Sequence, residues 1–241
     1  MDAERNYSEL AQRARAALAS VNASPGVAKP DPILLAENVR RNFGGVTAVD
    51  VQHLEVQRGS ITALIGPNGA GKTTLFNLLT GFDTPDTGEW MFDSKNLKKV
   101  VAHKTASLGM VRTFQLTKSL TKLSVIENMK LGATHQIGEK WWNGLLPFRY
   151  RKQEAIIERR ADELLKRFKL DHMRDQYAGT LSGGQRKLLE MARALMTNPR
   201  LVMLDEPMAG VNPALKQSLN EHIRGLRDDG MTVLFVEHDM D

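Results

Sequence analysis

The sequence predicts an α/β fold with a mostly parallel sheet, and two observations carry this prediction. Short apolar runs alternate with helical patterns from about residue 33 onward, as expected where helices cover both faces of a sheet. A glycine-rich stretch that ends in Lys-Thr-Thr directly follows one of these runs, which is typical of a loop between a strand and a helix. The 241 residues include 41% hydrophobic side chains and no cysteine, so a hydrophobic core can hold the fold without disulfides or a cysteine-bound metal.

The first 32 residues differ in pattern from the rest. Apolar side chains recur at helical spacing in residues 1–24, which predicts a short amphipathic helix. Residues 24–32 contain three prolines and one glycine and predict a linker. We therefore expect residues 1–32 to form an N-terminal helical extension and linker, and residues 33–241 to form the main domain.

The remaining elements follow from the apolar pattern. Residues 116–180 are mostly helical and charged, and they predict an inserted helical subdomain. Because no apolar run reaches about 20 residues, we expect no membrane-spanning helix, and the chain to be soluble or peripheral to a membrane. The N-terminus lacks the apolar region of a signal peptide, which favours a cytoplasmic location. Strands are expected at residues 33–39, 48–56, 61–65, 90–92, 111–115, 201–204 and 232–236, and helices at residues 72–80, 125–131, 151–168, 183–196 and 213–228.

The strongest motif is a complete GxxxxGK(S/T) phosphate-binding loop between the strand at residues 61–65 and a helix. Its glycines allow backbone N–H groups to turn toward phosphates, and the positive end of the following helix points at them. Lys72 is expected to reach the β- and γ-phosphates of a nucleotide, and Thr73 to offer its hydroxyl to Mg²⁺. The predicted phosphate-binding residues are Gly66, Pro67, Asn68, Gly69, Ala70, Gly71, Lys72, Thr73 and Thr74.

A second motif consists of four apolar residues at 201–204 followed by Asp205 and Glu206. Alone, this pattern also fits a solvated strand end. Beside a phosphate-binding loop, Asp205 is expected to anchor Mg²⁺, usually through water because Mg²⁺ keeps much of its hydration shell. Glu206 points elsewhere than its neighbour and is predicted to polarise the attacking water as a general base.

A third motif, Ser182-Gly183-Gly184-Gln185, precedes a predicted helix, and His238 follows the last apolar strand. Alone, the third motif also fits a linker or a helix cap. With all four motifs in this order, residues 33–241 resemble the ATP-binding subunit of an ABC transporter. The resemblance implies a P-loop NTPase fold with an antiparallel β portion. It also implies that Ser182 to Gln185 face the γ-phosphate held by a second ATPase subunit, so that each ATP lies between two subunits.

Other positions match the family one by one. Gln115 resembles the glutamine that contacts metal and water and relays the nucleotide state to the helical insertion. Phe43 stands where an aromatic side chain stacks on adenine, and His238 resembles the switch histidine that contacts the γ-phosphate. Asn212 departs from the pattern, because many relatives have Asp there and an amide keeps a hydrogen bond but not a charge.

Residues 181–213 and 237–241, with the long insertion at 135–153, resemble the ATPases of branched-chain amino-acid importers and their urea and amide relatives. The resemblance implies an ATP-hydrolysing motor that drives import of a small polar solute, with branched-chain amino acids as the leading candidates. It implies ATP and Mg²⁺ as cofactors. The implied partners are transmembrane permease subunits and a second ATPase, identical or different, with the chain peripheral at the cytoplasmic face of the inner membrane.

Three alternatives stay open from sequence. ATPases of lipopolysaccharide exporters form a neighbouring group. ABC ATPases that act on nucleic acid or ribosomes usually carry long coiled coils or two cassettes, neither of which is visible here, and a small-molecule P-loop kinase would not need the third motif. Residues 140–169 hold nine basic and four acidic side chains, which fits either a solvated helix face or attraction to anionic lipid; no direct contact with nucleic acid is expected.

The C-terminal end carries one further expectation. The chain ends three residues after His238, whereas the resemblance implies a further strand and helix. We therefore expect the domain to lack its usual C-terminal strand and helix.

Overall fold

The computed structural model describes residues 2–21, 27–97, 100–113, 120–133 and 147–238. The chain divides into two compact units, one formed by residues 1–112 and 200–241 and the other by residues 113–199. Within the described ranges, no helix combines the length and the apolar character that a membrane crossing requires. The proposed division into an extension, a main domain and a helical insertion at 116–180 stays a prediction.

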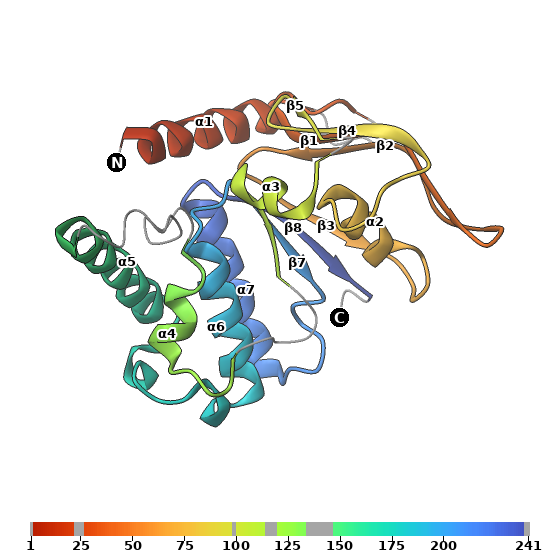
Figure 1. Ribbon diagram of the computed structural model, residues 1–241. Helices are drawn as coiled ribbons and strands as arrows, with labels where there is room; N and C mark the ends of the chain where they lie inside the picture. Colours follow the sequence, from red (N-terminus) through yellow and green to blue (C-terminus); the bar gives the residue numbers. More distant parts are fainter. Residues whose placement is uncertain (1, 22–26, 98–99, 114–119, 134–146, 239–241) are drawn as a thin grey trace. The chain divides into compact units, whose positions relative to one another are not determined.

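The first unit contains an antiparallel and a parallel sheet of four strands each (Figure 1). The strand orders are β2-β1-β4-β5 and β3-β8-β7-β6. The predicted α/β class is therefore confirmed, with a larger antiparallel part than the apolar runs alone indicate. The strands are β1 (Pro32–Phe43), β2 (Val46–Gln57), β3 (Ile61–Ile65), β4 (Thr87–Phe92), β5 (Lys95–Asn96), β6 (Met110–Arg112), β7 (Leu201–Asp205) and β8 (Thr232–Glu237), and the helices of this unit are α1 (Asp2–Ala19), α2 (Lys72–Leu79), α3 (Ala102–Ser107) and α7 (Pro213–Asp228).

The β1–β2 hairpin is longer than predicted because its turn is tight. Phe43 pairs with Val46, and the two glycines between them have φ angles of 53° and 90°. Positive φ at both central residues is the geometry that matches the twist of antiparallel strands. The strands therefore continue to the turn instead of ending several residues before it.

The predicted strand at residues 111–115 is wrong at its C-terminal end. β6 pairs with β7 only from Met110 to Arg112, opposite Leu201 to Met203, and Thr113 is already outside the strand. β7 continues to Asp205 because β8 pairs with it on the other side. Gln115 itself lies outside the described residues.

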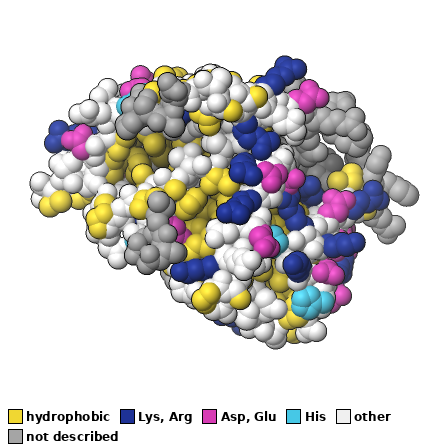
Figure 2. Space-filling view, turned by 180° about the vertical axis from the view of Figure 1, so that it is seen from behind, with side chains coloured by type: hydrophobic (Ala, Val, Ile, Leu, Met, Phe, Trp, Pro, Cys, Tyr) yellow, Lys and Arg dark blue, Asp and Glu magenta, His cyan; other side chains and the backbone are white. Residues whose placement is uncertain are grey.

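The surface carries both signs of charge. In the face drawn in Figure 2, basic and acidic side chains of the described residues are interspersed. On α7, for example, Asp228 pairs with Arg227 at 2.7 Å and lies 3.7 Å from Arg15 of α1. Part of the positive charge is thus compensated locally.

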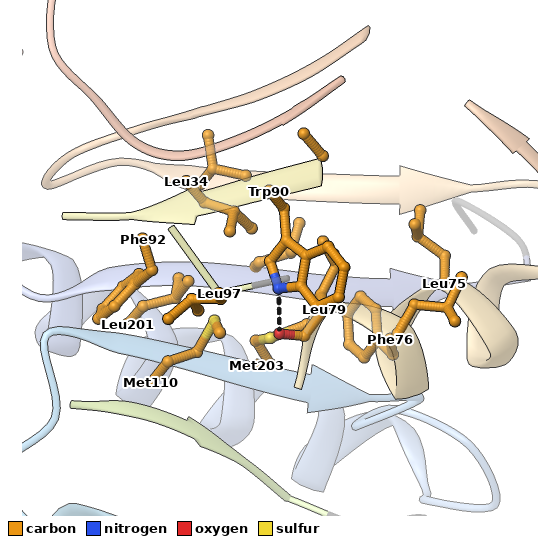
Figure 3. Packing of buried hydrophobic residues seen from close by; sticks show 14 of the residues in the cluster. Leu34, Leu75, Phe76, Leu79, Trp90, Phe92, Leu97, Met110, Leu201 and Met203 are labelled. Atoms are coloured by element: carbon orange, nitrogen blue, oxygen red, sulfur yellow. Dashed lines mark hydrogen bonds between the residues drawn. The ribbon is translucent and has the colours of Figure 1, made fainter. Parts of the chain in front are cut away.

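The core of the first unit lies between the two sheets and fixes α2 (Figure 3). Trp90 of β4 is 2% exposed, and its indole Nε1 donates to the carbonyl of Leu79 at 3.1 Å. This bond ties the end of α2 to the antiparallel sheet, while the ring of Phe76 faces the guanidinium of Arg112 in β6 of the parallel sheet. Because α2 begins at Lys72, the packing also holds the phosphate-binding loop. Other members of this core include Leu34, Leu75, Phe92, Leu97, Met110, Leu201 and Met203.

Within the first unit, the N-terminal helix α1 packs against Gly59 and the end of β2. Ala11 is fully buried, and a Cβ placed on Gly59 would lie 2.9 Å from the Cβ of Ala11. The side chain of Gln57 donates to the carbonyl of Ala14 at 3.0 Å. Small residues on both surfaces thus allow close approach of the helix to the end of β2.

The second unit is helical. Asn128 is fully buried in it, where its amide donates to three backbone carbonyls and accepts from the N–H of Leu120. Arg174 bonds to Glu158, Asp162 and Asp175 and so ties the chain that follows the long helix α5 (Pro147–Arg167) back to that helix. The helices of this unit are α4 (Val125–Lys130), α5 (Pro147–Arg167) and α6 (Gly183–Leu195), with 3-10 turns at Asp171–Met173 and Ala178–Thr180.

Candidate nucleotide-binding site

The predicted phosphate-binding loop connects β3 to α2, as expected. Gly71 precedes the helix with φ of 79°, in the left-handed region that favours glycine. A Cβ at this position would lie 2.0 Å from the carbonyl oxygen of Ala48 in β2. Glycine is therefore required here both by conformation and by the close approach of another strand.

Lys72 lies within the loop that precedes it. The residue is 8% exposed, and its ammonium Nζ donates to the carbonyls of Gly66 at 2.6 Å and Pro67 at 2.8 Å. The first N–H groups of α2 have no partner within the helix and carry its positive end. The ammonium and the helix N-terminus together make this part of the loop suited to anions.

A cavity of about 240 Å³ opens over the loop. Two of its walls come from residues distant in sequence, Glu206 after β7 and His238 after β8. The parallel pairing of β3 with β8 and of β8 with β7 brings these strand ends to one edge of the sheet. The lining residues are Ala48, Asn68, Gly69, Ala70, Gly71, Lys72, Thr73, Thr74, Glu206 and His238.

Glu206 turns away from the strand that delivers it. Its φ angle is 49°, and its N–H donates to the carbonyl of Val236 at 3.1 Å. Its carboxylate Oε1 lies 2.5 Å from Nε2 of His238. The left-handed backbone thus points Glu206 into the cavity while Asp205 stays in the interior, which agrees with the prediction that the two acids point to different places.

Asp205 is the most buried acid of the site, with a side chain 2% exposed. Its Oδ2 lies 2.5 Å from the guanidinium of Arg112, whereas its Oδ1 is buried and has no hydrogen-bond partner among the described residues. Carboxylate and hydroxyl oxygens are the ligands that Mg²⁺ prefers, directly or through water. The unpaired oxygen of Asp205 and the hydroxyl of Thr73, which lines the cavity, are therefore chemically suited to Mg²⁺.

Sequence reasoning missed two residues that shape this region. Arg112, the last residue of β6, pairs with Asp205; the available signal was a charged residue at the end of an apolar strand. Glu237 accepts the N–H of Met208 at 2.9 Å and so holds the loop after Glu206. No sequence motif indicated this second bond.

The residues of the third motif begin α6 in the helical unit. Ser182 is the N-cap: its hydroxyl accepts from the N–H of Gln185 at 3.2 Å, and its own N–H donates to the Gln185 side chain at 2.9 Å. Such a reciprocal capping box stabilises the helix start. Because the hydroxyl oxygen only accepts in this arrangement, its proton is left to donate. Gly183 has no heavy atom within 4 Å of a Cβ placed on it, so the start of the helix is open.

The structure also shows the contacts of Phe43 and Asn212, two positions singled out from the sequence. Phe43 is 48% exposed at the tip of the first hairpin, with the guanidinium of Arg41 4.7 Å from its ring centre. Arg41 is held by Asp83 and Asp86. Asn212 caps α7, since its side-chain oxygen accepts from the N–H of Leu215 at 2.9 Å; a helix cap thus accounts for a polar residue at this position.

A phosphate-binding loop follows the parallel strand β3, and Glu206, which follows β7, lines the same cavity; β8 lies between these two strands in the sheet. This arrangement of loop, helix and acid defines a P-loop nucleoside triphosphatase. Residues 49–209 match the family model for ABC transporters. The chain belongs to this family and is an ATP-binding subunit that hydrolyses ATP to power transport.

Curated relatives and solved structures give the same assignment. The chain is 42% identical over 209 residues, 87% of this chain and 80% of that protein, to a probable branched-chain amino acid transport ATP-binding protein of Archaeoglobus fulgidus. It is 39% identical over 212 residues, 87% of this chain and 83% of that protein, to the high-affinity branched-chain amino acid transport ATP-binding protein of Escherichia coli. It also resembles the ADP conformation of an ATP-binding cassette from an ABC transporter, with 40% identity, a TM-score of 0.75, and coverage of 87% of this chain and 82% of that chain.

Proposed function

We propose that this chain is the ATPase motor of an importer for branched-chain amino acids, bound peripherally to permease subunits at the cytoplasmic face of the inner membrane. The names of the relatives support this solute class, because proteins 39% and 42% identical to this chain are branched-chain amino acid transport ATP-binding proteins. Transport would then follow from closing and reopening of paired ATPase subunits, which the permease subunits convert into movement of the solute.

In the proposed mechanism the loop at residues 66–74 binds the triphosphate through its backbone N–H groups and the ammonium of Lys72. Thr73 and Asp205 would hold Mg²⁺, with Gln115 as a further ligand, and the metal would neutralise charge that develops on the phosphates. Glu206 orients the attacking water and takes its proton as the general base. His238, which lies against the Glu206 carboxylate at 2.5 Å, would contact the γ-phosphate, and Phe43 would stack on adenine.

The second half of each site would come from another subunit. Ser182, Gly183, Gly184 and Gln185 would present a hydroxyl, N–H groups and the N-terminus of α6 to the γ-phosphate bound by the partner. A dimeric ATP-binding cassette in a post-hydrolysis state, bound to ADP and phosphate, is 26% identical with a TM-score of 0.68 over 86% of this chain and 88% of that chain. This likeness supports pairing but leaves both an identical and a different partner ATPase as candidates.

One structural observation carries the proposed ATPase mechanism: Glu206 and His238 line the same cavity as Lys72 and Thr73. The solute class is carried by the relatives and is what the experiment tests. The experiment is to isolate the intact complex from membranes, reconstitute it in vesicles with its binding protein, and measure uptake of labelled leucine with ATP. We expect ATP-dependent uptake that is lost when the complex carries Lys72→Ala. ATP hydrolysis that responds to no branched-chain amino acid, or movement of a lipid in the opposite direction, would contradict the proposed solute.

A further inference from the structure

A buried ion pair links two elements of the site. The side chains of Arg112 and Asp205 are 5% and 2% exposed, and Nη2 of Arg112 lies 2.5 Å from Oδ2 of Asp205. The two residues are 93 positions apart in sequence and meet because β6 and β7 pair in parallel, with Arg112 opposite Met203. Taking both charges out of water is costly, so an ion pair this deeply buried is weak evidence for a purely stabilising role.

The same guanidinium also reaches the helix of the phosphate-binding loop. Nη1 of Arg112 donates to Oδ1 of Asn77 at 2.6 Å, and the guanidinium carbon lies 5.5 Å from the ring centre of Phe76. Asn77 and Phe76 belong to α2, which begins with Lys72 and Thr73. One side chain thus fixes both the strand that delivers Asp205 and the helix that delivers Thr73.

The contact to Asp205 occupies only one of its two oxygens. Oδ2 accepts from Arg112, and the buried Oδ1 has no hydrogen-bond partner among the described residues. A carboxylate fixed at one oxygen presents the other in a defined direction. Partners that orient a metal-binding carboxylate in this way affect metal affinity, typically by 10- to 100-fold.

We propose that Arg112 is a positioning residue for the metal: it orients the free oxygen of Asp205 and keeps it in register with the hydroxyl of Thr73. This inference rests on the proposed role of Asp205. The planar guanidinium suits the task because it binds the Asp205 carboxylate and the Asn77 amide at once. A Lys ammonium keeps the charge but lacks the rigid fork that spans both partners.

A role of Arg112 through its charge alone and a role in positioning Asp205 predict different metal affinities for variants of Arg112. If Arg112 acted only through its charge, Arg112→Met would strengthen metal binding, since a cation would be removed from beside the site, and Arg112→Lys would leave it unchanged. If Arg112 positions Asp205, both variants weaken metal binding. Asn77→Ala, which removes only the contact to α2, should weaken it in the same direction by a smaller factor.

The test measures metal binding directly. The full chain, saturated with the non-hydrolysed ATP analogue AMP-PNP, is titrated with MnCl₂ as an oxygen-liganded substitute for Mg²⁺, and free Mn²⁺ is followed by its EPR signal. Affinity for AMP-PNP in EDTA is measured in parallel. We expect Arg112→Lys and Arg112→Met to raise the apparent Kd for Mn²⁺ by about tenfold or more, with metal-free nucleotide affinity within about twofold of the wild type.

Arg58 provides matched control variants. Its side chain is also buried, at 9% exposed, and pairs with Asp31 at 2.8 Å and Asp93 at 2.9 Å, but it lies outside the residues that line the cavity. Arg58→Lys and Arg58→Met should lower the thermal midpoint, as loss of any buried ion pair does, and leave Mn²⁺ affinity unchanged.

The outcomes separate this inference from the function on which it depends. An unchanged Mn²⁺ affinity in both Arg112 variants, or tighter binding in Arg112→Met alone, would overturn the positioning role. An equal loss in the Arg58 variants would also overturn it, because metal affinity would then follow general stability. A wild-type chain that binds no Mn²⁺ with the nucleotide would instead contradict the proposed function itself, and the inference with it.

Discussion

At the scale of single residues, Glu206 and His238 form the pair on which catalysis is proposed to depend. We expect Glu206→Gln to lower the rate of ATP hydrolysis by about 10² or more, because the amide keeps the shape and removes the base. ATP binding should persist, since the phosphates are bound by the loop and Lys72. Phosphate release measures the rate of hydrolysis, and equilibrium binding measures the affinity for ATP.

The matched control for this prediction is Glu221→Gln, which changes an exposed acid on α7 and should hydrolyse ATP at the wild-type rate. Hydrolysis by Glu206→Gln at the rate of this control would show that another group acts as the base. Lys72→Ala should behave differently from both, losing tight ATP binding together with activity.

Two glycines of the loop allow steric contact to be separated from backbone strain. Gly69 and Gly71 have φ angles of 80° and 79°, so alanine is strained at both, by about 1–2 kcal/mol. Only at Gly71 would the added Cβ meet another atom, the carbonyl of Ala48, whereas none lies within 4 Å at Gly69. We expect Gly71→Ala to lose roughly 1–3 kcal/mol more than Gly69→Ala in urea unfolding; equal losses would mean that β2 moves aside without cost.

At the scale of elements, the ion pairs around Arg174 predict an acid-sensitive helical unit. Hydrogen bonds from Arg174 and then Lys130 hold the pKa of Glu158 below its ordinary value of 4.5. A carboxyl whose pKa is lowered on folding stabilises the fold above its unfolded pKa, and this contribution is lost as the pH falls through the folded pKa. We therefore expect the free energy of unfolding to fall below about pH 4.5, and less steeply in Arg174→Gln.

Urea unfolding at a series of pH values from about 6 to 3 measures this dependence. The control is Arg159→Gln, a change at an exposed position of the same helix, α5. It should keep the wild-type slope. Parallel curves for wild type and Arg174→Gln would show that the Glu158 contact contributes nothing in solution.

Features set by residues close together in the sequence could be predicted, whereas features set by contacts between distant residues could not. The phosphate-binding loop and the ends of α2 and α7 follow from glycine, proline and capping residues within a few positions, and their predicted limits agree closely with the structure. The pairing of Arg112 with Asp205 depends on the register of β6 against β7 across 93 residues. No spacing along the chain encodes that register. The role of Asp205 could therefore be predicted from its motif, but its pairing with Arg112 could not.

The alternative interpretation of the third motif also proved partly right. Without the other motifs, Ser-Gly-Gly is better explained as a linker or a helix cap, and Ser182 does cap α6. Capping and the proposed phosphate contact use different parts of the same hydroxyl, because its oxygen accepts from the N–H of Gln185 and its proton remains available. The local sequence indicates only the cap, whereas the phosphate contact is implied by the resemblance to ABC ATPases, and neither shows that the two roles are compatible.

At the scale of the whole molecule, α1 is expected to contribute to stability and not to nucleotide binding. Ala11 is fully buried against Gly59 and Gly230. Ala11→Leu should therefore cost about 1–3 kcal/mol through overpacking, while ATP affinity stays within about twofold, or roughly 0.4 kcal/mol. Ala16→Leu, at an exposed position of the same helix, should change stability by less than about 0.5 kcal/mol.

Urea unfolding and ATP binding of both variants test this expectation. A loss of ATP affinity in Ala11→Leu alone would show that the packing of α1 reaches the site through the end of β2. Equal stability of the two variants would show that the helix does not pack closely in solution.

The indole of Trp90 gives the nucleotide-binding unit an optical reporter of its own. The chain has three tryptophans, and Trp141 and Trp142 belong to the long insertion. With both of these replaced by phenylalanine, the intrinsic fluorescence would come from one buried ring whose N–H is bonded to the last turn of α2. A shift of its emission to longer wavelength would then report solvent entry between the two sheets, independently of events in the helical unit.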